Sequence, residues 1–260
     1  MTRQRVNYNQ IASEYDDRYI NPSLEERGKA LVELAGKLQA DRMLEVGCGT
    51  GHWLGAMHAV TQGLYGLDAS LGMLKQAHSR EGALKLACGY ARQLPFKDNC
   101  FDLVFCIHAI HHFEDPRAFI GEAFRVLRGG GALAIVGSDP HRRRDDWYVY
   151  QYFEGTHETD LGRFPAWEAL SEWMAAHGFD RIKLREVERV DHRKHGRQVF
   201  DDPFLGKNAC SQLALLGEEA YAAGMRRIEA ALTEAEAREE TVLFRSEFSI
   251  GMLLGQKVAS

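Results

Sequence analysis

The chain has 260 residues, of which 45% are hydrophobic and 27% charged, and its formal net charge is −5. This length allows one large α/β domain or a core domain with a smaller cap, and we expect the second arrangement. A net negative charge provides no general attraction to nucleic acid or anionic membranes, so we expect neither as a partner. The polar N-terminal residues and the lack of a long apolar run predict a cytoplasmic protein.

Cysteine usage predicts reduced thiols. The five cysteines form no C-x-x-C pair, and their number is odd. Most of them lie in apolar runs that are typical of buried strands. We therefore expect neither disulfides nor a metal site from Cys48, Cys88, Cys100, Cys106 and Cys210.

The apolar spacing predicts helices over residues 8–19 and 22–39, which precede the first strand as a cover. From residue 42 onward, short apolar runs alternate with helical stretches, as is typical of β-α-β units on a parallel sheet. We expect strands near residues 42–47, 63–68, 84–88, 101–107, 131–137, 180–188 and 242–254, and helices near 51–60, 70–79, 116–127 and 166–177.

Two long connections interrupt this alternation and predict the domain organisation. Right-handed crossovers place both connections at the carboxyl edge of the sheet, where α/β folds bind ligands. We expect cofactor-covering helices in 1–40, a core in 41–189 and 240–260, a lid insertion at 138–165 and a helical substrate cap in 190–239. An amphipathic helical pattern in the cap also allows a homodimer.

A glycine-rich loop, Gly47-Cys48-Gly49-Thr50-Gly51, follows the first predicted strand. Glycines allow left-handed backbone angles and let the main chain approach a ligand closely. Dinucleotide-binding loops have the spacing G-x-G-x-x-G, whereas this loop has G-x-G-x-G after Glu45. The loop alone leaves open a nicotinamide-dependent oxidoreductase, or a turn that binds nothing.

Asp68 ends the second predicted strand. A carboxylate at that position can accept hydrogen bonds from both hydroxyls of a ribose. Alternatively it can cap the following helix, a role for which Ser70 competes.

Residues 44–137 contain these two features in order with two further segments, Ala91–Phe96 with the strand after it and Glu122–Gly131. Together they resemble the motifs of the class I S-adenosylmethionine-dependent methyltransferases, in particular the small-molecule UbiE or type 11 members. The resemblance implies an α/β, Rossmann-like, seven-stranded, mostly parallel sheet in the order 3-2-1-4-5-7-6, with the last strand antiparallel, helices on both faces and a helical cap.

The resemblance also implies the chemistry. S-adenosyl-L-methionine is the expected cofactor and S-adenosyl-L-homocysteine the product, with no metal. Its sulfonium makes the methyl group electrophilic, so an in-line displacement by a small-molecule acceptor needs little more than alignment. A non-catalytic cofactor-binding or regulatory protein remains an alternative, because many family members have an acid where this chain has Tyr90.

The cofactor-binding residues implied by the family follow from the matching positions. The glycine loop wraps the methionine part, Asp68 binds the ribose, and Ala69 and Met73 lie near the adenine. Tyr15 and Tyr19, one helical turn apart, close over the methionine end or form a packed aromatic pair. The full set is Tyr15, Tyr19, Glu45, Gly47, Cys48, Gly49, Asp68, Ala69, Met73, Tyr90, Ala91, Arg92 and Ile107.

Three histidines, His108, His111 and His112, follow the fourth predicted strand, at the edge where the methyl group should be presented. Histidine suits proton transfer near neutral pH, so each is a candidate base or positioning residue. In the family the His-His-Phe motif commonly has a structural part. No carboxylate or cysteine stands at metal-ligand spacing beside them.

Aromatic residues gather in the predicted lid: Trp147, Tyr148, Tyr150, Tyr152 and Phe153. They provide apolar walls for a substrate pocket, or they pack the lid against the core. The neighbouring run Arg142–Arg144 binds an anionic group or forms a solvated loop with the two aspartates that follow.

Overall fold

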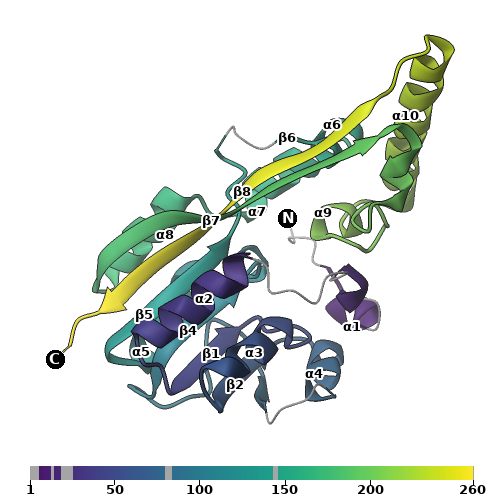
Figure 1. Cartoon of the computed structure of the whole chain (residues 1–260). Coiled ribbons are helices and arrows are strands. Elements are labelled where there is room, and N and C mark those ends of the chain that lie inside the picture. The colour runs from purple at the N-terminus through teal and green to yellow at the C-terminus, as the bar shows by residue number, and fades with distance from the viewer. Residues whose placement is uncertain (1–5, 13–14, 19–25, 80–83, 143–145, 260) are drawn as a thin grey trace.

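The computed structural model describes residues 6–12, 15–18, 26–79, 84–142 and 146–259. Within them the strands form one sheet in the order β3-β2-β1-β4-β5-β8-β6, and β7 pairs with β8 (Figure 1). Strand β8 is antiparallel to its neighbours, while β1 to β5 are parallel. The strands are β1 Arg42–Val46, β2 Gly63–Asp68, β3 Lys85–Cys88, β4 Phe101–Ile107, β5 Leu127–Gly137, β6 Asp146–Trp147, β7 Phe179–His195 and β8 Leu243–Lys257.

This topology confirms the predicted fold class and strand order, with β7 and β8 as the sixth and seventh long strands. The two-residue strand β6 is an addition that apolar patterning does not reveal. Strand β5 begins at Leu127, before the predicted start at residue 131.

Alternate strand residues face opposite sides of the sheet, and each side is covered by helices. On β4, Val104 and Cys106 join a core with α5 and α8, while Leu103 and Phe105 join a second core with α2 and α3. The covering helices are α2 Glu26–Lys37, α3 His52–Ala56, α4 Leu71–His78, α5 Pro116–Val126 and α8 Trp167–Ala176.

Strands β7 and β8 extend well beyond the core as a paired arm, with α10 beside its far end (Figure 1). The predicted strands 180–188 and 242–254 are both shorter than the observed ones, because the outer part of β7 is charged and exposed and is held by pairing with β8. A third core lies on this arm. The helices that contribute to it are α6 Tyr148–Tyr152, α9 Ser211–Ala214 and α10 Glu218–Ala237, and α7 Thr156–Arg163 contacts α6 and α9.

The continuous helix predicted over residues 8–19 is wrong. The chain instead forms a short helix, α1 Tyr8–Ile11, and a separate 3-10 turn, η1 Tyr15–Arg18. The short helix α1 makes polar contacts with the core. The Asn9 side-chain oxygen accepts hydrogen bonds from the Ser70 hydroxyl and the Gly72 amide, both at 2.8 Å.

The Thr50 hydroxyl donates to the Asp16 carboxylate at 2.5 Å, so the N-terminal segment also contacts the glycine loop. The start of the predicted helix 22–39 lies outside the described residues, and α2 begins at Glu26 within them. Among the described helices, none combines the length and apolar character that crossing a membrane requires.

Candidate active site

A cavity opens at the carboxyl ends of β1, β2 and β4, under α1 and η1. Most of the predicted cofactor residues line it, although they come from five separate segments. Those that line it are Tyr15, Gly47, Gly49, Asp68, Ala69, Met73, Tyr90, Ala91, Arg92 and Ile107, together with His108, His111 and His112. Tyr19 lies outside the described residues.

The glycine loop leaves β1 in a left-handed conformation, with φ of 76° at Gly47 and 52° at Gly49. A Cβ at Gly47 would lie 2.6 Å from the Ala109 Cβ, whereas a Cβ at Gly49 would meet nothing within 4 Å. The amides of Gly47 and Cys48 both donate to the Leu67 carbonyl, at 2.7 and 3.1 Å. The loop therefore folds back onto the end of β2 and presents bare backbone to the cavity.

Asp68 faces this loop. One carboxylate oxygen accepts a hydrogen bond from the Gly49 amide and the other from the Ser70 amide, each at 2.8 Å. The Ser70 hydroxyl caps α4 by accepting from the Met73 amide at 3.2 Å, so the capping role belongs to Ser70. Each carboxylate oxygen can accept more than one hydrogen bond, which leaves Asp68 able to bind a ligand.

Burial raises the pKa of Asp68 above its ordinary value, and hydrogen bonds from the backbone of Ser70, Gly49 and Ala69 oppose the shift. The same amides that hold the loop therefore favour the charged form of the carboxylate. Asp68 is an acceptor group at the part of the cavity formed by β2.

Glu45 and Cys48 do not line the cavity, which corrects any expectation of direct contact from their side chains. Glu45 is 1% exposed and points into the protein interior beside β4. Burial, and then the nearby Asp68, raise its pKa well above the ordinary value. The Cys48 sulfur is buried against the Cα of Gly66.

The far end of the cavity is formed by the segment after β3. The Tyr90 side chain is 53% exposed, and the Arg92 guanidinium lies 5.1 Å from the centre of its ring. Arg92 also forms an ion pair with Glu114. The sequence offers no acid at this end, and the structure supplies a mixed aromatic and cationic wall instead.

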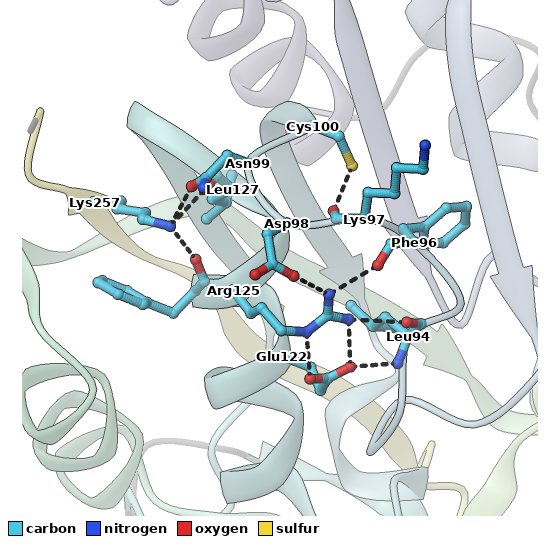
Figure 2. A network of polar contacts seen from close by, with 11 residues as sticks. Leu94, Phe96, Lys97, Asp98, Asn99, Cys100, Glu122, Arg125, Leu127 and Lys257 are labelled. Atoms are coloured by element: carbon cyan, nitrogen blue, oxygen red, sulfur yellow. Dashed lines mark hydrogen bonds and ion pairs between the residues drawn. The ribbon is translucent and has the colours of Figure 1, made fainter.

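The loop that continues from this wall is fixed to α5 by Arg125 (Figure 2). Its guanidinium donates to the carbonyls of Leu94 and Phe96, at 2.9 and 2.8 Å. It also pairs with Glu122 and Asp98, and Glu122 accepts from the Leu94 amide at 2.7 Å. This network holds the loop without entering the cavity, so the segment Glu122–Gly131 acts as a scaffold.

His108 has a left-handed backbone, with φ of 48°, and is half-buried in the cavity wall. The Arg27 guanidinium lies 2.6 Å from its Nε2 and is paired with Glu188 at 2.8 Å. Because a guanidinium only donates, Nε2 must accept, and the proton of the neutral ring lies on Nδ1. Burial, Arg27 and His112 lower the pKa of His108 to about 3. These contacts favour a positioning role for His108 over a basic one.

The other two histidines contact segments outside the sheet, namely α1 and the residue that follows α7. The Tyr8 hydroxyl lies 2.8 Å from Nε2 of His112, which joins α1 to the end of β4. The buried His111 ring stacks on Phe164, with 3.8 Å between ring centres and 11° between planes. His112 is therefore a candidate for proton transfer, because the Tyr8 hydroxyl lies next to it.

The aromatic residues predicted for the lid are not among the residues that line this cavity. Tyr148, Val149 and Phe153 pack in the third core, and the Tyr148 hydroxyl donates to Asp202 at 3.0 Å. Arg142 pairs with Glu168 on the surface, and the other two arginines of the run lie outside the described residues.

The residue that sequence reasoning missed is Arg163, which lines the cavity from the end of α7. It sits in a segment whose charged residues show no regular spacing, so no sequence signal distinguishes it from surface arginines. Tyr8, Ala109 and Phe113 also line the cavity without having been predicted. Within the described ranges, no group of three or more His, Cys, Asp or Glu side chains has an arrangement suited to a metal ion.

Comparison with known proteins agrees with this geometry. Residues 44–135 match a family model described as a methyltransferase domain. The uncharacterized methyltransferase YcgJ of Bacillus subtilis is 26% identical over 187 residues, which are 70% of this chain and 72% of that protein. The crystal structure of YcgJ is similar with a TM-score of 0.60 and 19% identity, covering 90% of this chain and 98% of that one.

Two further proteins have named acceptors. The malonyl-[acyl-carrier protein] O-methyltransferase of Methylococcus capsulatus is 33% identical over 148 residues, 55% of this chain and 53% of that protein. A Haemonchus contortus phosphoethanolamine N-methyltransferase 2, solved with phosphomonomethylethanolamine and S-adenosylhomocysteine, has a TM-score of 0.60 at 17% identity, covering 96% of this chain and 57% of that one. This chain spans about half the length of several curated relatives, from 46% to 53%.

Proposed function

Because the chain belongs to the class I S-adenosylmethionine-dependent methyltransferase family, we propose that it transfers a methyl group from S-adenosyl-L-methionine to a small-molecule acceptor. The observation that carries this proposal is the junction of Asp68 with the glycine loop at one cavity wall. Its named relatives include enzymes that act on a malonyl group and on demethylmenaquinone, which supports an organic acceptor.

The residues of the cavity fit this cofactor. Bare backbone at Gly47 and Gly49 forms a cradle that a side chain would obstruct, and Asp68 provides acceptor oxygens where a ribose would need them. We assign Ala69 and Met73 to the adenine side and Tyr90 to Arg92 to the far wall. When bound, the cofactor would supply an electrophilic methyl group on a sulfonium.

The protein's own contribution is alignment and exclusion of water. Tyr8 and Tyr15 cover the cavity from the N-terminal segment, with 6.0 Å between their ring centres. Arg27 fixes His108 as an acceptor at Nε2, so the ring proton is on Nδ1, and we assign to this N–H the role of orienting the methyl acceptor. Where the acceptor carries a proton, we assign its removal to His112 with the Tyr8 hydroxyl.

This proposal is tested by incubating the purified protein with methyl-labelled S-adenosyl-L-methionine and a small-molecule extract, and by titrating it with S-adenosylhomocysteine. We expect label in a compound of low molecular mass and a saturable affinity for S-adenosylhomocysteine. Binding of S-adenosylhomocysteine without transfer to any fraction would favour the non-catalytic alternative. Binding of NADH in place of S-adenosylhomocysteine would contradict the proposal.

A further inference from the structure

Arg163 is a cationic residue buried in the wall of the cavity that the proposed reaction uses. Its side chain is only 6% exposed, and it comes from α7, in the lid that follows β5 and β6. Burying a guanidinium costs free energy unless charged or polar partners compensate. A buried arginine does not contribute to the solubility of a helix surface. Its presence in the wall of a ligand cavity therefore needs another explanation.

The position of Arg163 along the cavity follows from its neighbours. The Arg163 guanidinium lies 5.5 Å from the centre of the Phe164 ring, and that ring stacks on His111 at 3.8 Å. His111 follows β4, whereas Asp68 ends β2 and Tyr90 follows β3, both on the other side of β1. Arg163 is therefore on the β4 side of the cavity, away from the wall that we assign to ribose and adenine.

A fixed polar cluster holds the arginine in this position. Its Nη2 donates to the Asp160 carboxylate at 2.5 Å and lies 3.0 Å from the Ser211 hydroxyl. Two bonds from one nitrogen, to groups on α7 and α9, orient the plane of the guanidinium. The side chain is thus preorganised before any ligand arrives.

The carboxylate of Asp160 accepts hydrogen bonds from several donors. Asp160 is fully buried, and its second oxygen accepts from the Tyr150 hydroxyl at 2.8 Å and from the Gln212 amide at 2.6 Å. These two neutral donors stabilise the carboxylate together with the arginine. Arg163 lines the cavity and Asp160 does not, so the cationic end of the pair is the one that faces the cavity.

We propose that Arg163 binds a carboxylate or phosphate group of the methyl acceptor, which makes the acceptor an anionic small molecule. This inference rests on the proposed methyl transfer. A guanidinium fork matches the planar oxygens of a carboxylate or the tetrahedral oxygens of a phosphate, and such charge-assisted pairs are strong in a buried site. The carboxylate of the cofactor's own methionine part shares this chemistry, so the test must distinguish the two sources.

The experiment uses the full chain saturated with S-adenosylhomocysteine and measures binding of three probes by calorimetry: benzoate, phenyl phosphate and the neutral benzamide. The variants are Arg163→Gln and the double variant Asp160→Asn with Arg163→Gln, which removes both charges and leaves no unpaired buried carboxylate. Arg142→Gln is the matched control, because it removes a half-exposed lid arginine that does not line the cavity.

We expect at least one anionic probe to bind the wild-type protein and to bind both Arg163 variants at least tenfold more weakly. Affinity for S-adenosylhomocysteine should change by less than threefold, Arg142→Gln should behave as wild type, and benzamide should bind weakly throughout. Arg163→Lys should restore part of the affinity, since it keeps the charge but loses the fork.

Three results would overturn the inference: no binding of either anion, equal binding of an anion to wild type and variants, or binding of benzamide as tightly as of benzoate. A tenfold loss of S-adenosylhomocysteine affinity in the variants would also overturn it, by assigning the arginine to the cofactor. The proposed function fails separately, if the wild-type protein does not bind S-adenosylhomocysteine.

Discussion

The carboxylate of Asp68 accepts a hydrogen bond from the amide of Gly49 across 2.8 Å, which joins the end of β2 to the loop after β1. One side chain therefore supports the bare backbone of the loop and provides acceptor oxygens to the same cavity. In the proposed reaction, loss of this carboxylate removes both effects at once.

We predict that Asp68→Ala weakens binding of S-adenosylhomocysteine by about 10- to 100-fold, equivalent to roughly 1.4–2.8 kcal/mol. The physical reason is the loss of a charged acceptor together with the support of the Gly49 amide. Calorimetric titration measures the effect. Asp115→Ala is the control, because it removes the cap of α5, with its 2.9 Å bond to the Ala118 amide, outside the cavity. The control should lose about 1 kcal/mol of stability and keep its affinity. Equal affinities for wild type and Asp68→Ala would remove Asp68 from the site.

Gly47 and Gly49 give a second prediction, because they have similar backbone angles and different surroundings. Gly47→Ala would place its Cβ 2.6 Å from that of Ala109, so we expect a fall in thermal stability of several degrees as well as lost cofactor binding. In Gly49→Ala the added Cβ has no neighbour within 4 Å, so the free energy of unfolding should fall only by the backbone strain, about 1 kcal/mol. The added methyl group should still obstruct the cradle and weaken cofactor binding.

Thermal unfolding and S-adenosylhomocysteine titration, run on both glycine variants, separate the two effects. The expected pattern is a large loss of stability for Gly47→Ala alone and a loss of binding for both. A Gly49→Ala protein that binds S-adenosylhomocysteine as wild type does would contradict the assignment of that glycine to the cradle.

Much of the sheet can be predicted from sequence because its central strands are buried on both faces. Residues 101–107 are predicted as a strand with the observed bounds of β4, and they lie between two hydrophobic cores. The outer half of β7 was missed for the opposite reason. Residues 191–195 are all polar, and pairing with β8 rather than burial keeps them in a strand.

The residues of the candidate site likewise include some that the sequence predicts and some that it does not. Gly47, Gly49 and Asp68, which line the cavity, could be predicted as cofactor residues because the proposed roles need special backbone angles or a carboxylate at a strand end. Arg163 and Tyr8 were missed because they reach the cavity from α7 and from the N-terminal segment, through tertiary contacts without any local spacing. The division of the three histidines between roles likewise depends on Arg27, which is far away in sequence.

Arg125 carries a third prediction, about the loop beside the far wall of the cavity. Arg125→Met removes donors to the carbonyls of Leu94 and Phe96 and leaves Glu122 without its ion-pair partner (Figure 2). We expect a loss of about 1–3 kcal/mol in unfolding free energy, measured by urea denaturation. Arg128→Met, which removes a partly exposed ion pair with Asp102 between the starts of β5 and β4, should cost less than about 1 kcal/mol.

Because Arg125 does not touch the cavity, S-adenosylhomocysteine should still bind the folded Arg125→Met protein, with an affinity reduced only by the mobility of the loop. Hydrogen exchange of the amides in residues 93–100 should accelerate in this variant. Unchanged exchange there would show that other contacts hold the loop.

The last prediction concerns the pH dependence of stability and rests on His108. Its pKa is about 3 in the folded protein, against an ordinary value of 6.5, because of burial, Arg27 and His112. Between these two pH values the unfolded chain binds a proton at this residue and the folded protein does not. Stability therefore rises with pH across this window, by up to about 1.4 kcal/mol per pH unit, and is lost as the pH falls from 6.5 toward 3.

The matched variant is His108→Gln, whose side-chain oxygen can accept the Arg27 hydrogen bond but cannot titrate. We expect the unfolding free energy of wild type minus that of His108→Gln to fall steadily as the pH is lowered below 6.5, measured by urea denaturation at several pH values. Glu45 and Asp68, whose pKa values are raised, contribute the opposite slope, but both proteins contain them, so their effect cancels in the difference. A difference that stays constant, or grows as the pH falls, would show that His108 is protonated in the folded protein, and a basic role for it would then be restored.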